Sequence, residues 1–259
     1  MRYLHKILIA AAVAAASIPA AAGELRRGAE VTVERALGGD TLALAGGRVL
    51  RLAGVLAPRP GDARGHAREV AAAAAAARDA LDRLARGRSL VLWQGALAED
   101  RHGRIVAQAR TPEGAWLADE MLRLGHARVF TQPEAAERAA EMLKREAEAR
   151  AAKRGLWALA AYAVRGDEEA DRFTDSFQIV EGRVLKAAPA RAIYYLNFGR
   201  DIRRDFTIGL DRAALRAFRR AGLDPKALEG KRVRVRGWVL WRGGPYIGAT
   251  HPEQVEVLD

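Results

Sequence analysis

The sequence predicts a mainly β protein with helices (α+β), built as two small β-barrels in succession. The first observation behind this prediction is segment order: strand-like alternation is interrupted by helical periodicity in both halves of the chain. The second is length, because 259 residues suffice for two small domains with separate cores. The third is a polar, acidic stretch at 166–176 that is typical of a linker. We therefore expect domains at 23–165 and 177–259.

The first half is predicted to hold five strands and three helices. Alternation around Val31 and Val33 marks the first strand, and glycine pairs at 38–39 and 46–47 turn the chain into the next two. An alanine-rich run indicates a long helix, which Gly87 ends. The predicted strands are 29–37, 41–44, 49–55, 89–93 and 105–110, and the predicted helices are 67–86, 116–124 and 133–153.

The second half is predicted to hold three strands, a helix and two more strands. Asp211 is a good N-cap for the helix, and Gly222 ends it. The predicted strands are 177–185, 193–198, 206–210, 232–241 and 246–249, with the helix at 212–221. This order is that of an OB-fold, a small five-stranded barrel. We expect this second OB-like barrel to make few contacts with the core of the first domain.

Composition favours an anionic partner and excludes cysteine chemistry. Lys and Arg number 43 against 32 Asp and Glu, a formal net charge of +11. Such a surplus suits nucleic acid or another polyanion, although a GC-rich genome that uses Arg and Ala freely explains it equally well. The chain has no cysteine, which rules out disulfides, thiolate catalysis and cysteine-ligated zinc.

Residues 1–22 have the pattern of a secretory signal peptide. Arg2 and Lys6 precede an apolar run at 7–17, and alanines at 20–22 form a cleavage site. The run is too short and alanine-rich for a membrane anchor, and no later segment reads as a membrane span. We therefore expect an exported protein, periplasmic or secreted, with no membrane span after signal removal.

Four short motifs carry the functional information. Residues 39–41 read GDT, 51–59 read RLAGVLAPR, 100–104 read DRHGR and 152–157 read AKRGLW. In this order and spacing they resemble the staphylococcal nuclease-like (thermonuclease) family over about 29–157. The resemblance implies a five-stranded OB-type barrel with three helices.

The resemblance also implies a site, with two of its acidic residues replaced. In that family two Asp bind calcium, arginines clamp the phosphate, and a Glu positions the attacking water. Asp40, Thr41 and Arg51 match the family pattern, and Arg104 matches its second phosphate arginine. Leu56 stands at the second acidic ligand.

Arg59 stands where the family has the catalytic Glu, and an arginine stays protonated and cannot act as a base. We expect Arg59 to bind Asp40 in calcium's place, so that no cofactor is needed. Calcium is the metal that the resemblance allows. Whether the chain is an enzyme stays open, because Asp62 or Glu69 could supply a displaced carboxylate.

The second half interleaves aromatic and basic residues, with Trp238 and Trp241 as the candidate binding residues. OB-folds bind single strands with a positive groove and stacking aromatics. The alternative is that the aromatics are core and the cations a solvated face.

Three functions follow from these observations. The first is an exported protein that binds nucleic acid or another phosphate-bearing polyanion through Arg51, Arg59 and Arg104, with weak or no hydrolysis. The second is a calcium-dependent phosphodiesterase or endonuclease that acts on DNA and RNA. The third is an envelope adaptor that binds protein through the charged helix at 133–153.

Overall fold

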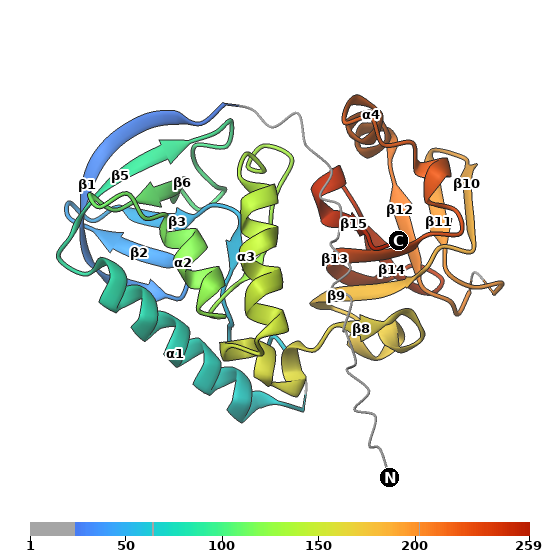
Figure 1. Ribbon diagram of the computed structural model, residues 1–259, viewed down its shortest axis with the longest axis horizontal. Coiled ribbons are helices and arrows are strands. Elements are labelled where there is room, and N and C mark those ends of the chain that lie inside the picture. Colours follow the sequence, from blue (N-terminus) through green and yellow to red (C-terminus); the bar gives the residue numbers. More distant parts are fainter. Residues whose placement is uncertain (1–23, 64, 202) are drawn as a thin grey trace, which may run out of the picture.

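A computed structural model describes residues 24–63, 65–201 and 203–259, so the predicted signal peptide at 1–22 lies outside the described residues. The described chain forms two lobes joined through β8 and the short helices before it (Figure 1). No helix in this described part is both long and apolar enough to span a bilayer. The fold is mixed α and β, as predicted.

The first lobe is a closed barrel of five strands. These strands are β1 (Arg26–Gly38), β2 (Thr41–Leu44), β3 (Val49–Leu52), β5 (Ser89–Gln94) and β6 (Ile105–Arg110). Their order is β1-β2-β3-β6-β5, with β3 and β6 parallel and the other pairs antiparallel. Shifts of register within β1 let this long strand bend and pair with both β2 and β5, which closes the barrel.

The predicted third strand is interrupted at Gly54. This glycine has φ +77°, and a side chain there would meet the Met142 side chain at 2.4 Å. The chain therefore leaves the barrel after β3 and forms β4 (Val55–Leu56), which pairs with β7 (Arg128–Val129) in a separate two-stranded sheet. This break turns the segment that follows towards the candidate site.

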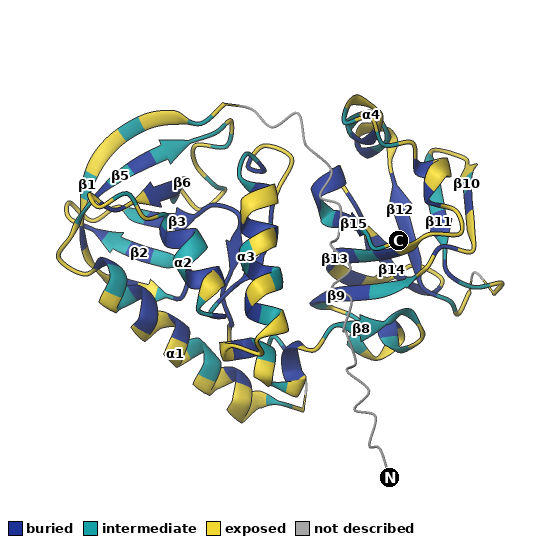
Figure 2. Cartoon of the chain, viewed as in Figure 1, coloured by how far each residue is buried: buried dark blue, intermediate teal, exposed yellow. Residues whose placement is uncertain are grey.

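Three helices cover the first barrel: α1 (Ala67–Ala85), α2 (Leu117–Arg123) and α3 (Ala139–Ala151). Helix α1 is buried along one side and exposed along the other (Figure 2), and its Ala77 and Leu81 join the barrel core. Helix α3 is shorter than the predicted 133–153. Its buried residues include Glu146 as well as apolar side chains.

Residues 166–176, predicted to be a linker, lie mostly in regular structure. After the short helices η1 (Gly155–Ala158) and η2 (Ala160–Tyr162) come β8 (Arg165–Gly166) and η3 (Asp167–Phe173). Strand β8 pairs in parallel with the first long strand of the second lobe, and Ala170 of η3 is buried in that lobe's core. The segment therefore packs as part of the second lobe.

The second lobe repeats the strand order of the first barrel. Its elements are β9 (Ser176–Arg183), β10 (Lys186–Ala190), β11 (Ile193–Asn197), β12 (Thr207–Leu210), α4 (Arg212–Arg220), η4 (Pro225–Leu228), β13 (Arg232–Trp241), β14 (Pro245–Gly248), η5 (Pro252–Gln254) and β15 (Val255–Val257). The sheet runs β10-β11-β12-β14-β13-β9-β8, with β15 added to β13. Strands β12 and β14 are parallel, as β3 and β6 are in the first barrel.

The predicted strand 177–185 is split into β9 and β10. The amide of Val184 donates to the Lys231 carbonyl beside β13, and the amide of Leu185 donates to the Asn197 carbonyl of β11. The chain thus crosses from one side of the sheet to the other within two residues. Helix α4 falls between β12 and β13, where the sequence predicts it, and Asp211 caps it by accepting from the Ala214 amide.

Buried charges join the two lobes, although their apolar cores stay separate. Arg236 on β13 is 1% exposed, and its Nη1 lies 2.8 Å from Glu146 Oε2 on α3. Its Nη2 lies 2.5 Å from Glu256 Oε1 on β15. Arg128 Nη1 donates to the Phe177 carbonyl at 2.9 Å. The two apolar cores remain separate, and polar groups fasten one lobe to the other.

Candidate functional site

Four charged side chains meet at one end of the first barrel. Asp40 lies in the turn between β1 and β2, Arg51 on β3, Arg59 in the loop after β4, and Arg104 immediately before β6. Thr41 pairs with Arg51 across β2 and β3, and β3 lies beside β6, so the barrel order brings these positions together. The structure thus brings Asp40, Arg51 and Arg104 to the same end of the barrel.

Asp40 is buried, and each of its carboxylate oxygens is bound. Oδ2 lies 3.0 Å from Arg51 Nη1 and 3.1 Å from Arg59 Nη2, and it accepts from the Ala57 amide at 2.9 Å. Oδ1 accepts from the Thr41 hydroxyl at 2.8 Å. Burial alone would raise the pKa of Asp40, but the two guanidinium groups and these hydrogen bonds lower it below its ordinary value. Asp40 is held as an anion without any other cation.

The three arginines differ in how free they are. Arg51 is buried, and besides Asp40 its guanidinium donates to the carbonyls of Leu52 and Val55 at 3.3 and 2.8 Å. Arg104 donates from Nε to Asp100 Oδ2 at 2.7 Å. The Arg59 side chain is 46% exposed. Arg51 therefore acts mainly inside the barrel, while Arg59 and Arg104 present charge to solvent.

Close backbone packing fixes the position of Asp40. A side chain on Gly39 would lie 2.6 Å from Ala77 Cβ on α1 and 2.7 Å from Ala57 Cβ. Only a glycine allows the β1–β2 turn to pack so closely against the Ala77 and Ala57 side chains. This close packing lets the Asp40 carboxylate accept a hydrogen bond from the Ala57 amide. The GDT motif thus has a packing reason for its first residue.

Two adjoining hollows open at this end of the barrel and share Arg59 and Arg104. The aspartate hollow, of about 480 Å³, is lined by Asp40, Thr41 and the loop at 57–60. The arginine hollow, of about 420 Å³, is lined by Arg51, Arg101, Phe130 and Trp238, among others. Both present guanidinium groups to solvent, which suits a phosphate.

Comparison with known proteins identifies this half of the chain. The family model of staphylococcal nuclease homologues matches residues 49–159, which include β3, β6, all three helices and the loop of Arg59. Residues 49–159 are a staphylococcal nuclease homologue domain. No curated protein matches the chain.

The nuclease homologue domain offers a poor donor set for calcium. This ion prefers six to eight oxygen ligands, with carboxylates supplying the charge. Asp40 is already paired with two guanidinium groups, and the buried Leu56 side chain offers no oxygen. Across residues 24–63, 65–201 and 203–259, no cluster of three or more His, Cys, Asp or Glu side chains is placed to hold a metal ion.

The two carboxylates considered as displaced bases are already bound within the protein. Asp62 Oδ2 accepts from the Arg59 amide at 3.2 Å and lies 2.9 Å from Nη2 of the buried Arg128. Glu69 lies 3.4 Å from His66 at the start of α1. Neither residue lines the aspartate hollow or the arginine hollow of the nuclease homologue domain. Both candidate bases are therefore already paired with a cation or a histidine.

Trp238 and Trp241, predicted together as binding residues, occupy different places. Trp238 lies in the wall of the arginine hollow, although it belongs to the second lobe. Trp241 is 60% exposed at the end of the same strand and lines neither hollow. The sequence gives no sign that a second-lobe residue reaches the nuclease homologue site, because only the docking of the lobes brings it there. Phe130, which also lines the arginine hollow, is a further residue that sequence reasoning missed.

Proposed function

We propose that the protein binds nucleic acid, or another phosphate-bearing polyanion, at the nuclease homologue site with weak or no hydrolysis. The observation that supports this most is the pairing of Asp40 with both Arg51 and Arg59. A guanidinium stands where a cation-dependent nuclease needs its metal and its base. The charge that would hold calcium is neutralised from within the protein.

The remaining groups suit a phosphate. Arg59 is half-exposed, and Arg104 keeps 30% of its side chain exposed beside it. Arginine presents paired N–H donors that match two phosphate oxygens. The ion pairs of Arg59 with the buried Asp40 and of Arg104 with Asp100 hold both guanidinium groups in place. A phosphate that binds them therefore loses little free energy to ordering the two side chains.

We also propose that the protein acts outside the cytoplasm, in the periplasm or as a secreted protein. The support is the charged start, apolar run and alanine cleavage site of residues 1–22. The mass of the mature protein recovered from cell fractions tests this. Recovery of the full-length chain from the cytoplasm would contradict it.

The central experiment measures retention and cleavage together. Labelled single-stranded DNA is incubated with purified protein in calcium and in chelator, and the salt dependence of binding is followed. We expect the DNA to be retained without cleavage in calcium and in chelator alike. We expect Arg59→Ala to weaken binding severalfold and to lower the slope of log affinity against log salt concentration by about one. Arg35→Ala, which removes an exposed arginine of β1 that lines neither hollow, is the matched control. Equal losses in the two variants would contradict the proposal.

The alternative is a calcium-dependent phosphodiesterase, and thermal unfolding separates it. A ligand that binds only the folded protein increases the free energy of unfolding, by about 2.7 kcal/mol at a concentration one hundred times its Kd. The melting temperature therefore rises with ligand concentration. We expect no such rise for the natural protein at millimolar calcium. The double change Leu56→Asp with Arg59→Glu restores two carboxylates and is expected to bring it about. A clear calcium-dependent rise in the natural protein would favour the nuclease.

No observation favours the third alternative, a protein-binding adaptor. Part of the helix predicted as its surface is used within the chain, since Glu146 of α3 is fully buried against Arg236. Binding that depends on phosphate charge and weakens with salt separates the polyanion proposal from this alternative.

A further inference from the structure

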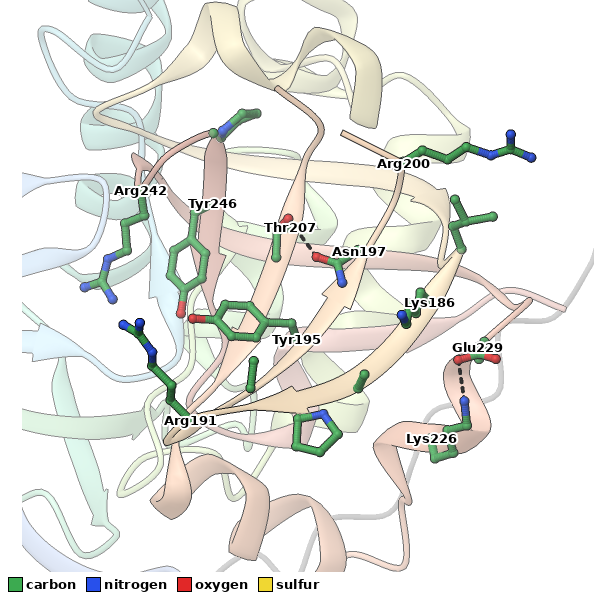
Figure 3. Close-up of a pocket in the computed structure, with 17 residues that line it drawn as sticks. Lys186, Arg191, Tyr195, Asn197, Arg200, Thr207, Lys226, Glu229, Arg242 and Tyr246 are labelled. Carbon is green, nitrogen blue, oxygen red and sulfur yellow. Dashed lines mark hydrogen bonds and ion pairs between the residues drawn. The ribbon is translucent and has the colours of Figure 1, made fainter. Parts of the chain in front are cut away.

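A third and larger hollow lies on the outer face of the second lobe. This tyrosine hollow has a volume of about 980 Å³ and is lined by β10, β11, β14 and the loops beside them (Figure 3). Its basic lining residues are Lys186, Arg191, Arg200, Lys226 and Arg242, all exposed. Among the lining residues only Glu229 is acidic, and it is paired with Lys226 at 2.5 Å. The hollow is therefore strongly positive.

Two tyrosines give this hollow an aromatic floor. Tyr195 and Tyr246 lie with their hydroxyl ends towards each other (Figure 3). Tyr246 lies over Gly209, where a side chain would come within 2.0 Å of the tyrosine hydroxyl. The Arg242 guanidinium stacks on the Tyr246 ring, with Cζ 4.9 Å from the ring centre. Tyr246 is thus buried between Gly209 and Arg242, and the half-buried Tyr195 is the ring of the floor that faces solvent.

A row of exposed side chains on β13 runs between the arginine hollow of the nuclease homologue domain and the tyrosine hollow. Leu240 of β13 is the direct cross-strand partner of Tyr246, so the two side chains lie about 5 Å apart on one face. Trp238 lies two residues before Leu240 and on the same side of the strand, about 7 Å away. Trp238 is 47% exposed and Leu240 is 37% exposed, so this row faces solvent. The row of Trp238, Leu240 and Tyr246 thus extends from the wall of the arginine hollow to the floor of the tyrosine hollow.

We infer that the two hollows are the ends of one track that binds a single-stranded nucleic acid along its length. This inference rests on the proposed function and extends it to the second lobe. A single strand offers phosphates at intervals and unstacked bases between them, which matches guanidinium groups and aromatic rings set along one track. A duplex keeps its bases stacked inside, and an isolated phosphate offers charge at one point only. Neither uses both ends of the track.

Arg191 has a backbone conformation that is unfavourable for an arginine. It stands at the tip of the β10–β11 hairpin with φ +55°, a conformation that favours glycine and is costly for an arginine. The turn would be less strained with glycine, yet the chain places a cation there, at the mouth of the tyrosine hollow. A strained residue kept beside a binding surface is typical of a functional position.

Oligonucleotide length is the variable that tests the track. Dissociation constants are measured by fluorescence anisotropy for single strands from about 4 to about 16 nucleotides, the range of site sizes on such barrels. We expect affinity to rise until the strand reaches both hollows and then to level off. Arg191→Gly is expected to weaken long strands at least about fivefold, leave the shortest unchanged, and keep or raise the melting temperature because glycine relieves the strain.

Trp238→Ala and Trp241→Ala form a matched pair on the same strand. Removing one stacked base contact costs about 1–3 kcal/mol, which corresponds to about fivefold to 150-fold in affinity. We expect that loss for Trp238→Ala and little change for Trp241→Ala. A duplex of equal length is expected to bind more weakly than the single strand.

The outcomes distinguish the track from the proposed function. Affinity that does not change with length, or long strands that bind Arg191→Gly as tightly as the natural protein, would overturn the track, while a loss in Arg59→Ala would still support the arginine hollow. Duplex binding equal to single-strand binding would overturn the choice of ligand. Failure of every oligonucleotide to bind would overturn both.

Discussion

Arg236 is the residue whose loss should most weaken the union of the two lobes. Its guanidinium is 1% exposed and lies between Glu146, which is fully buried, and Glu256. Arg236→Met keeps an unbranched apolar side chain but leaves the two carboxylates facing each other without their shared cation. Removing one partner of a buried ion pair costs about 3–5 kcal/mol, because the remaining charge stays buried.

The surrounding charges bound this magnitude from above. Arg150 lies 3.2 Å from Glu146, and Arg234 lies 3.3 Å from Glu256, so neither carboxylate is left with no cation. We therefore expect about 3–5 kcal/mol rather than the sum of two such losses. At about 2–4 °C for each kcal/mol in a chain of this size, the melting temperature should fall by about 6–20 °C.

Urea and thermal unfolding of three variants measure this effect. Arg232→Met is the matched control on the same strand: its side chain is 57% exposed and paired with Glu181, and such a surface pair contributes about 0–1 kcal/mol. Adding Glu146→Gln and Glu256→Gln to Arg236→Met removes the uncompensated charge and should recover part of the loss. A loss below about 1 kcal/mol for Arg236→Met would contradict this prediction, because removing one partner of a fully buried ion pair costs more than that.

Two further predictions concern the interface and the site. His251 Nε2 lies 2.7 Å from the Thr131 hydroxyl across the interface, and burial lowers the pKa of His251 from 6.5 to about 4. Between these two pH values the unfolded chain takes up a proton that the folded chain does not. The contribution of His251 to stability should therefore be fully present above pH 6.5, and the free energy of unfolding should fall by up to about 3 kcal/mol as the pH drops towards 4. The variant His251→Gln should make stability less dependent on pH in this range. An unchanged dependence in that variant would show that His251 is not the group responsible. Gly39→Ala forces a Cβ to within 2.6 Å of Ala77 and should cost about 1–3 kcal/mol in chemical unfolding, whereas Gly38→Ala, with open space around it, should cost less than about 1 kcal/mol. Equal costs would show that the close packing of the turn is not what requires glycine.

The candidate site could be predicted because its residues lie in short motifs. Asp40, Thr41 and Arg51 are separated by a single hairpin, so the strand register that joins them follows from local alternation and glycine turns. Arg59 follows Leu56 at the end of the next strand. Its replacement of an acidic residue suggested a pair with Asp40, and the structure places the two groups 3.1 Å apart.

The interface could not be predicted because its partners are remote and individually unremarkable. Arg236 and Glu146 are 90 residues apart, and each stands in a segment that alternates charge in the manner of a solvated face. That the two side chains are buried against each other can be seen only once the lobes are docked. The same holds for Trp238, which sequence alone places on the second barrel and which the fold brings to the first.

The charged nature of the docking surface has a consequence for the order of assembly. A chain is synthesised from its N-terminus, so the first barrel can form while the strands of the second are still being made. Its docking face combines the charges of Glu146 and Arg128 with the ring of Phe130, which packs edge-on against Phe177 of the second lobe. The cation of Arg236 on β13 and the carboxylate of Glu256 on β15 both come from the second lobe, so the charge network is complete only once the two lobes have docked.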